Sequence, residues 1–221
     1  MRWIWVGWVR WVVLFLALAA SVASAQTCTT QACAFVAGVP YLIPTGSAIA
    51  SFDGVVGPEW SGAFDKPTAV WIDGRRLPID LYLVQDGEYL FLAVRVAPKE
   101  RYKETLRVSI HFGNDDTNPS GPGDNLILLA ENLGQGGVDY HYEGYDKRAL
   151  DASQDAWGVG HWDPYARAYE FEARVKLASG DPQDMAFHAG VPFIIVVGLE
   201  TVGRDGKVTS ELKTPNLLMT I

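Results

Sequence analysis

Hydrophobic and polar positions alternate along residues 77–96, on both sides of an Asp86-Gly87 pair. Gly87 tolerates the positive φ angle that a tight hairpin turn requires, and Asp86 reaches such an angle at little cost. After the turn, odd-numbered positions from 89 to 95 would face one side, and even-numbered positions from 90 to 96 would face a core. The pattern predicts a β-hairpin and indicates a β protein.

Similar short segments recur along the chain, separated by turns rich in Gly, Pro, Asp and Asn. Residues 193–202 form a continuous apolar run, which is typical of a central strand, whereas residues 150–163 carry mixed signals and are expected to form a long loop. About nine to eleven strands with no strongly amphipathic helix predict an all-β fold, a single antiparallel β-sandwich of jelly-roll or immunoglobulin-like type with long loops. The other predicted strands cover residues 34–43, 68–72, 106–112, 126–130, 138–145, 169–177 and 217–221.

The first 25 residues have the order of a secretory signal peptide. A Trp-rich start flanked by Arg2 and Arg10 is followed by the apolar run 12–20, and Ala23-Ser24-Ala25 supplies a small-residue cleavage site. An uncleaved N-terminal anchor is the alternative interpretation. We expect a secreted or periplasmic protein with one domain, residues 26–221, and no transmembrane segment after signal removal.

Charge and cysteine content narrow the possible partners and the compartment. The net charge of −8 becomes −10 once the two signal-peptide arginines are removed, and an acidic chain repels phosphate backbones, so we expect no nucleic-acid partner. Cys28 and Cys33 are the only cysteines. In an oxidising compartment they predict a local disulfide within an N-terminal extension, residues 26–48. A metal pair or a redox dithiol is the alternative, but a zinc site would need a second ligand pair.

A family resemblance begins at Phe52-Asp53-Gly54, continues through Pro58-Glu59-Trp60-Ser61-Gly62-Ala63, and leads into the hairpin. This order resembles the start of the family 9 carbohydrate-binding-module-like domains, within the DOMON-like β-sandwich group. Residues 111–116 resemble the family's F-D-N-D loop, although Gly113 stands where an acidic residue is common, and residues 169–177 resemble its Tyr-x-x-E strand. The resemblance implies a β-sandwich that binds carbohydrate without cleaving it. We expect Trp60 to pin its turn-rich segment to the core.

Aromatic residues crowd the segment 138–165, and family 9 modules are thought to hold sugar between aromatic side chains. Sugar rings stack their apolar CH faces on aromatic planes, while polar side chains bind the hydroxyls. We therefore predict ligand-binding roles for Trp157, Trp162, Trp71 and Tyr142. The alternative is that each ring packs in the core or anchors a loop.

The polar loop 113–124 carries oxygen ligands of the kind that calcium prefers. Asn114, Asp115, Asp116 and Asp124 are the predicted calcium ligands, and calcium is the one cofactor that the leading hypothesis includes. The spacing is not that of an EF-hand, because the fixed Gly and the distal Glu are missing. The alternative is a solvated turn whose Asp and Asn side chains cap backbone groups.

We expect a binding protein rather than an enzyme, because the sequence has no nucleophile elbow, no H-E-x-x-H pair and no phosphate-binding loop. Carbohydrate is the first expected partner. A second hypothesis is an envelope structural or interaction protein that binds another envelope or extracellular protein and no sugar. A weaker alternative is a DOMON-like haem b protein, in which Met185 and His188 are the nearest pair of candidate ligands.

Overall fold

The computed structural model describes residues 39–47, 49, 52–72, 75–114, 125–130, 138–144 and 147–221. The chain divides into two units, Met1–Cys33 and Ala34–Ile221, and every described residue belongs to the second. The signal peptide and the Cys28–Cys33 disulfide lie outside the described residues and remain predictions. Within the described part of the chain, no helix is long and apolar enough to span a membrane.

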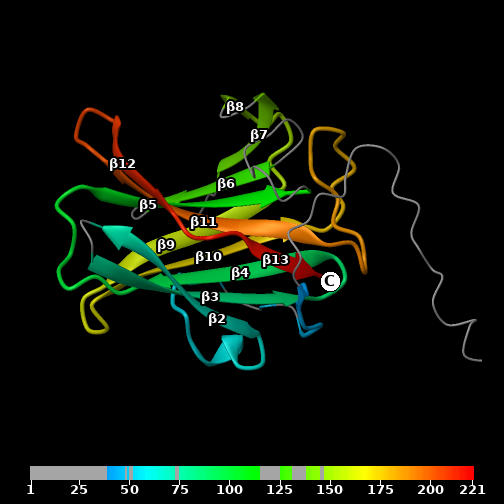
Figure 1. Ribbon diagram of the computed structural model, residues 1–221, viewed down its shortest axis with the longest axis horizontal. Coiled ribbons are helices and arrows are strands. Elements are labelled where there is room, and N and C mark those ends of the chain that lie inside the picture. The colour runs from blue at the N-terminus through cyan, green and yellow to red at the C-terminus, as the bar shows by residue number, and fades with distance from the viewer. Residues whose placement is uncertain are drawn as a thin grey trace, which may run out of the picture. The chain divides into compact units, whose positions relative to one another are not determined.

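The described residues form an all-β sandwich, as predicted. One sheet has the order β1-β13-β11-β5-β6-β7-β8, with β12 also paired to β11, and the other has the order β2-β3-β4-β10-β9 (Figure 1). Strand β1 pairs with β13 in parallel, and the hairpin and long-range pairs that build both sheets are antiparallel. The strands are β1 (Tyr41–Leu42), β2 (Phe64–Ile72), β3 (Arg75–Gln85), β4 (Tyr89–Val96), β5 (Thr105–Gly113), β6 (Asn125–Ala130), β7 (Val138–Gly144), β8 (Lys147–Leu150), β9 (Ala156–Asp163), β10 (Ala168–Lys176), β11 (Phe193–Val202), β12 (Val208–Lys213) and β13 (Leu217–Thr220), and a 3₁₀ turn spans Pro58–Trp60.

The predicted hairpin is confirmed as β3 and β4. Even-numbered residues from Leu90 to Val96 are fully buried in the main hydrophobic core, as the alternation predicted. Gly87 has the expected positive φ, at 92°. Asp86 has a different role from the expected one, because its Oδ1 accepts hydrogen bonds from the backbone N–H of Glu88 at 2.9 Å and of Tyr89 at 2.8 Å. The aspartate therefore stabilises the turn through its side chain.

The expectation of a long loop over residues 150–163 is wrong, because β9 occupies most of this range and pairs with β10 along its length. This strand was hard to recognise in the sequence because it contains glycines, which are depleted in strands. A Cβ at Gly158 would lie 2.6 Å from the backbone oxygen of Glu172, and one at Gly160 would lie 2.3 Å from Cδ1 of Phe171. The core packs so closely against β9 that these two positions have no room for a side chain.

Candidate functional site

The outer face of the five-stranded sheet carries rows of side chains that the strand register aligns. Strand β10 points Phe171 into the core and its two neighbouring glutamates, Glu170 and Glu172, outward. Glu170 lies opposite Arg95 of β4, and Arg95 lies opposite Asp80 of β3. Polar groups from three adjacent strands therefore share this face.

Residues 52–63 cover part of the outer face, and Glu172 is their main anchor. Its carboxylate is 0% exposed and accepts hydrogen bonds from Trp60 Nε1 at 2.7 Å and from the Gly54 backbone N–H at 2.8 Å. Burial raises the pKa of Glu172, and these two hydrogen bonds oppose that shift. Trp60 is 4% exposed, which confirms that it pins this segment.

Further contacts fix the same segment on both sides of Gly54. Glu170 accepts a hydrogen bond from the Val56 backbone N–H at 3.2 Å, and its second oxygen lies 3.2 Å from Nε of Arg95. Phe52 stacks on Phe91 of β4 with 5.9 Å between ring centroids. Because these partners come from two strands, the segment has a defined position over the sheet.

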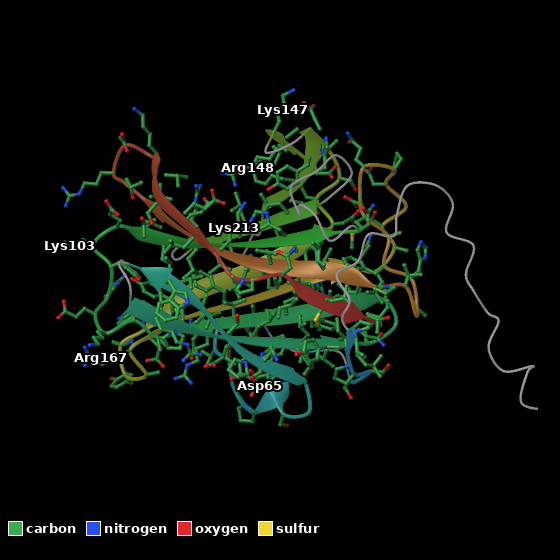
Figure 2. The ribbon with its side chains drawn as sticks, in the orientation of Figure 1. Asp65, Lys103, Lys147, Arg148, Arg167 and Lys213 are labelled. Atoms are coloured by element: carbon green, nitrogen blue, oxygen red, sulfur yellow. The ribbon has the colours of Figure 1, made fainter. Side chains whose placement is uncertain are left out.

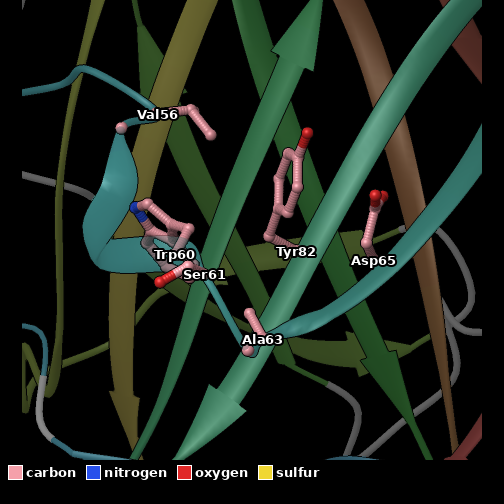
Figure 3. Close-up of a pocket in the computed structure, with 8 residues that line it drawn as sticks. Val56, Trp60, Ser61, Ala63, Asp65 and Tyr82 are labelled. Atoms are coloured by element: carbon pink, nitrogen blue, oxygen red, sulfur yellow. The ribbon is translucent and has the colours of Figure 1, made fainter.

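An open pocket of about 330 Å³ lies where this segment meets strands β2 and β3. The segment contributes the Trp60 ring and several smaller residues, whereas the sheet contributes Asp65 from β2 and Tyr82 from β3, which are directly paired across the strands. Figure 3 shows the Tyr82 ring standing between Trp60 and Asp65. The centroids of the Trp60 and Tyr82 rings are 6.4 Å apart. The pocket is lined by Val56, Gly57, Trp60, Ser61, Gly62, Ala63, Asp65 and Tyr82.

The surroundings of Tyr82 are acidic. Burial, with a smaller contribution from the Asp65 carboxylate, raises the pKa of Asp80, while the Arg95 guanidinium opposes this shift. Burial also raises the pKa of Tyr82, and Asp65 and Asp80 add to it. Figure 2 shows Asp65 on the opposite side of the sandwich from Lys147 and Arg148. The pocket thus combines an aromatic wall with the Asp65 carboxylate, and Asp80 lies beside it on the same face; these groups can stack on a ring and bind its hydroxyls.

The four aromatic residues predicted to bind ligand do not meet at one place. Trp157 and Trp162 both lie on β9, but their odd spacing puts them on opposite faces of the sheet. Trp157 meets Phe52 edge-on at 5.0 Å, and Trp162 packs on Tyr169 of the core at 4.6 Å.

Trp71 and Tyr142, the other two predicted residues, lie on different sheets. Trp71 is 65% exposed on β2, at the opposite edge of the five-stranded sheet from β9. Tyr142 is buried on β7, where its hydroxyl lies 3.0 Å from Nδ1 of His111. Their ligand-binding roles remain predictions.

The calcium prediction falls largely on residues that the structure does not describe. Asn114 is described and exposed, whereas Asp115, Asp116 and Asp124 lie outside the described residues. Within the described ranges, no three His, Cys, Asp or Glu side chains are placed to hold a metal ion. Calcium binding in this loop therefore remains a prediction.

Met185 and His188, the haem candidates, have different environments. Met185 is buried within the main core cluster, whereas His188 is exposed.

Sequence reasoning did not select Tyr82 or Asp65 as site residues. The signal for Tyr82 was present in the hairpin, because alternation puts Tyr82 and Asp80 on the face opposite to Leu81 and Leu83, which are fully buried. An aromatic and an acidic residue two positions apart on a non-core face are candidates for a binding surface. The family resemblance and Trp60 marked residues 52–63 as a segment anchored to the core, but nothing in the sequence placed that segment next to Tyr82 and Asp65.

Comparison with known proteins bears on the fold. No protein-family model matches the chain, and no curated protein does. Among solved structures, the chain is similar to a carbohydrate-binding module of family 9 from Caldicellulosiruptor kristjanssonii in complex with cellotriose, with a TM-score of 0.50, 11% identity, and coverage of 82% of this chain and 94% of that one. The chain has a family 9 carbohydrate-binding-module-like fold. A structure of a family 9 module from the same organism in complex with glucose gives a TM-score of 0.49 at 12% identity, covering 79% of this chain and 85% of that one. The family 9-like fold agrees with the resemblance inferred from residues 52–63 and the hairpin.

Proposed function

We propose that this chain is a non-catalytic carbohydrate-binding module, secreted or periplasmic, that binds sugar in the pocket between residues 56–63 and strands β2 and β3. The observation that carries the proposal is the pairing of the Tyr82 ring with the Asp65 carboxylate in an open pocket of about 330 Å³. The family 9-like fold supports the class of ligand, since the similar structure is a carbohydrate-binding module in complex with cellotriose. The expectation of a binding protein rather than an enzyme agrees with this likeness.

Binding would use stacking and hydrogen bonds. The apolar CH face of a sugar ring would lie against the Tyr82 ring, Asp65 and Asp80 would accept hydrogen bonds from hydroxyls, and Arg95 would donate. With net contributions of about 1.5–3 kcal/mol per charged hydrogen bond and a few such contacts, the expected Kd lies between about 1 mM and 1 µM.

The test is a titration of the mature chain with soluble glycans, together with affinity electrophoresis on insoluble ones, for the wild type, Tyr82→Ala and Asp65→Asn. We expect each variant to weaken binding at least tenfold. Asp65 is exposed, so Asp65→Asn should leave the fold intact, and circular dichroism checks both variants. The matched control is Tyr165→Ala, because Tyr165 is 97% exposed in the turn between β9 and β10.

Two outcomes would overturn the proposal. One is the absence of binding to every glycan tested, and the other is full binding by Tyr82→Ala. Co-purification with an envelope protein in the absence of sugar binding would favour the alternative function as an interaction protein.

A further inference from the structure

The outer face of the sheet continues beyond the pocket as an uncovered strip along β2 and β3. The register pairs Pro67 with Asp80, Ala69 with Pro78, and Trp71 with Arg76. These six residues alternate with the core residues of the two strands, and none of them is buried. Residues 52–63 therefore leave this part of the face open.

The middle of the strip is lined largely by short side chains with few rotamers. Pro67, Ala69 and Pro78 are short side chains that lose little or no rotamer freedom when a ligand covers them. A surface that is already ordered lowers the entropic cost of binding.

An aromatic ring stands at each end of the strip. Tyr82 forms the wall of the pocket at one end, and Trp71 is 65% exposed at the other. Because Val70 is buried in the core, strand alternation directs Trp71 to the outer face. The six-residue step from Asp65 to Trp71 spans about 20 Å at the rise of an extended strand, which is longer than a single sugar ring.

We propose that the pocket and this strip together bind several consecutive rings of an extended, linear polysaccharide, with Tyr82 and Trp71 stacking on separate rings. The inference rests on the proposed function, and it adds the ligand class and a second contact point. Covering a large exposed aromatic side chain and the neighbouring short apolar side chains removes apolar surface from water, which favours binding. Arg76, opposite Trp71, supplies donors for sugar hydroxyls at the far end.

The experiment is a titration with a linear oligosaccharide series of one linkage type, from the monosaccharide to the hexasaccharide, for the wild type, Trp71→Ala and Trp71→Tyr. We expect affinity to rise at least tenfold between the shortest and longest members that bind. Trp71→Ala should remove this gain and leave the affinity for the shortest ligands unchanged, while Trp71→Tyr should restore most of it. Tyr82→Ala should weaken binding to every member, and Tyr165→Ala to none.

The possible results separate this inference from the proposed function. If the wild type binds no member of the series and no other glycan, both fail. If sugars bind with an affinity independent of length, or if Trp71→Ala binds the longest members as tightly as the wild type does, the pocket is a sugar site and the extended strip is not.

Discussion

The contact between Glu172 and Trp60 should contribute measurably to stability, because it holds the pocket wall on the sheet. The perturbations are Glu172→Gln and Trp60→Phe, made singly and together. Glutamine keeps one acceptor oxygen but replaces the other with an amide group that donates. Since Glu172 accepts from both Trp60 and Gly54, one of these two buried donors would lose its acceptor.

The expected losses follow from burial and hydrogen bonding. Hydrogen bonds to charged groups contribute about 1.5–3 kcal/mol, and burial already raises the pKa of Glu172, so the cost of Glu172→Gln should fall at the lower end, near 2 kcal/mol. Trp60→Phe leaves a carboxylate oxygen without its donor and reduces the volume of a buried ring, at a cost of about 2–4 kcal/mol. The double variant should lose about 1–2 kcal/mol less than the sum of the two single losses, because neither partner is then left without the other.

Urea unfolding of residues 26–221, followed by circular dichroism, measures the free energies of unfolding of the wild type and the three variants, and these four values give the coupling energy. Trp162→Phe combined with Glu172→Gln is the control cycle, because Trp162 packs on Tyr169 on the core face of the sheet, away from residues 52–63, and the two changes should be additive. If the Trp60 and Glu172 changes are additive within about 0.5 kcal/mol, the buried contact does not stabilise the segment.

Three further predictions concern buried groups. Burial and two nearby carboxylates raise the pKa of Asp139 from 3.8 to about 7, so the native state keeps a proton that the unfolded state releases. This stabilising contribution is complete below pH 3.8 and is lost as the pH rises through 7. In thermal melts, Asp139→Asn should therefore become more stable relative to the wild type as the pH rises from about 4 to 8. A difference in Tm between the two proteins that stays constant with pH would contradict this prediction. Burial, with two nearby cations, lowers the pKa of His111 from 6.5 to about 3. The neutral imidazole therefore contributes to the stability of the native state above pH 6.5, and this contribution is lost as the pH falls toward 3. His111→Gln should reduce the dependence of Tm on pH between these two values. Gly160→Ala should destabilise by about 1–3 kcal/mol in urea because its Cβ would overlap Phe171, whereas Gly144→Ala, with open space around it, should have little effect; equal effects would show that the clash relaxes.

Local patterns in the sequence predicted much of the fold. The hairpin was predictable because the alternation of apolar and polar residues and the Asp-Gly turn indicate the same structure. Strand β11 was predictable because an unbroken apolar run is typical of a central strand, and β11 has a paired strand on each side. Strand β9 was not predictable, because Gly158 and Gly160 are explained only by core residues on other strands. Strand β12 was missed because it is largely exposed on both faces and so has no alternation.

The candidate site was harder to predict, because residues distant in the sequence build it. The hydrogen bond from Trp60 to Glu172 joins positions 112 residues apart, and no local sequence pattern predicts such a long-range contact. Crowding of aromatic residues was also a poor guide to proximity, since the five-residue spacing of Trp157 and Trp162 places them on opposite faces of one strand. By the same alternation, Tyr82 and Asp80 could have been assigned to the outer face.

The residues that carry the family resemblance form one hydrogen-bonded unit. Gly54 and Trp60 come from the first phrase of that resemblance, Glu172 comes from its Tyr-x-x-E strand, and the three meet at a single buried carboxylate. The resemblance thus marks the anchor that positions the pocket wall, while Tyr82 and Trp71 lie on the neighbouring surface. Because the anchor and the open surface share no hydrogen bond among those described, substitutions at Trp71 or Asp65 should weaken binding without unfolding the sandwich. The anchor fixes the shape of the neighbouring surface, and the side chains on that surface determine what it can bind.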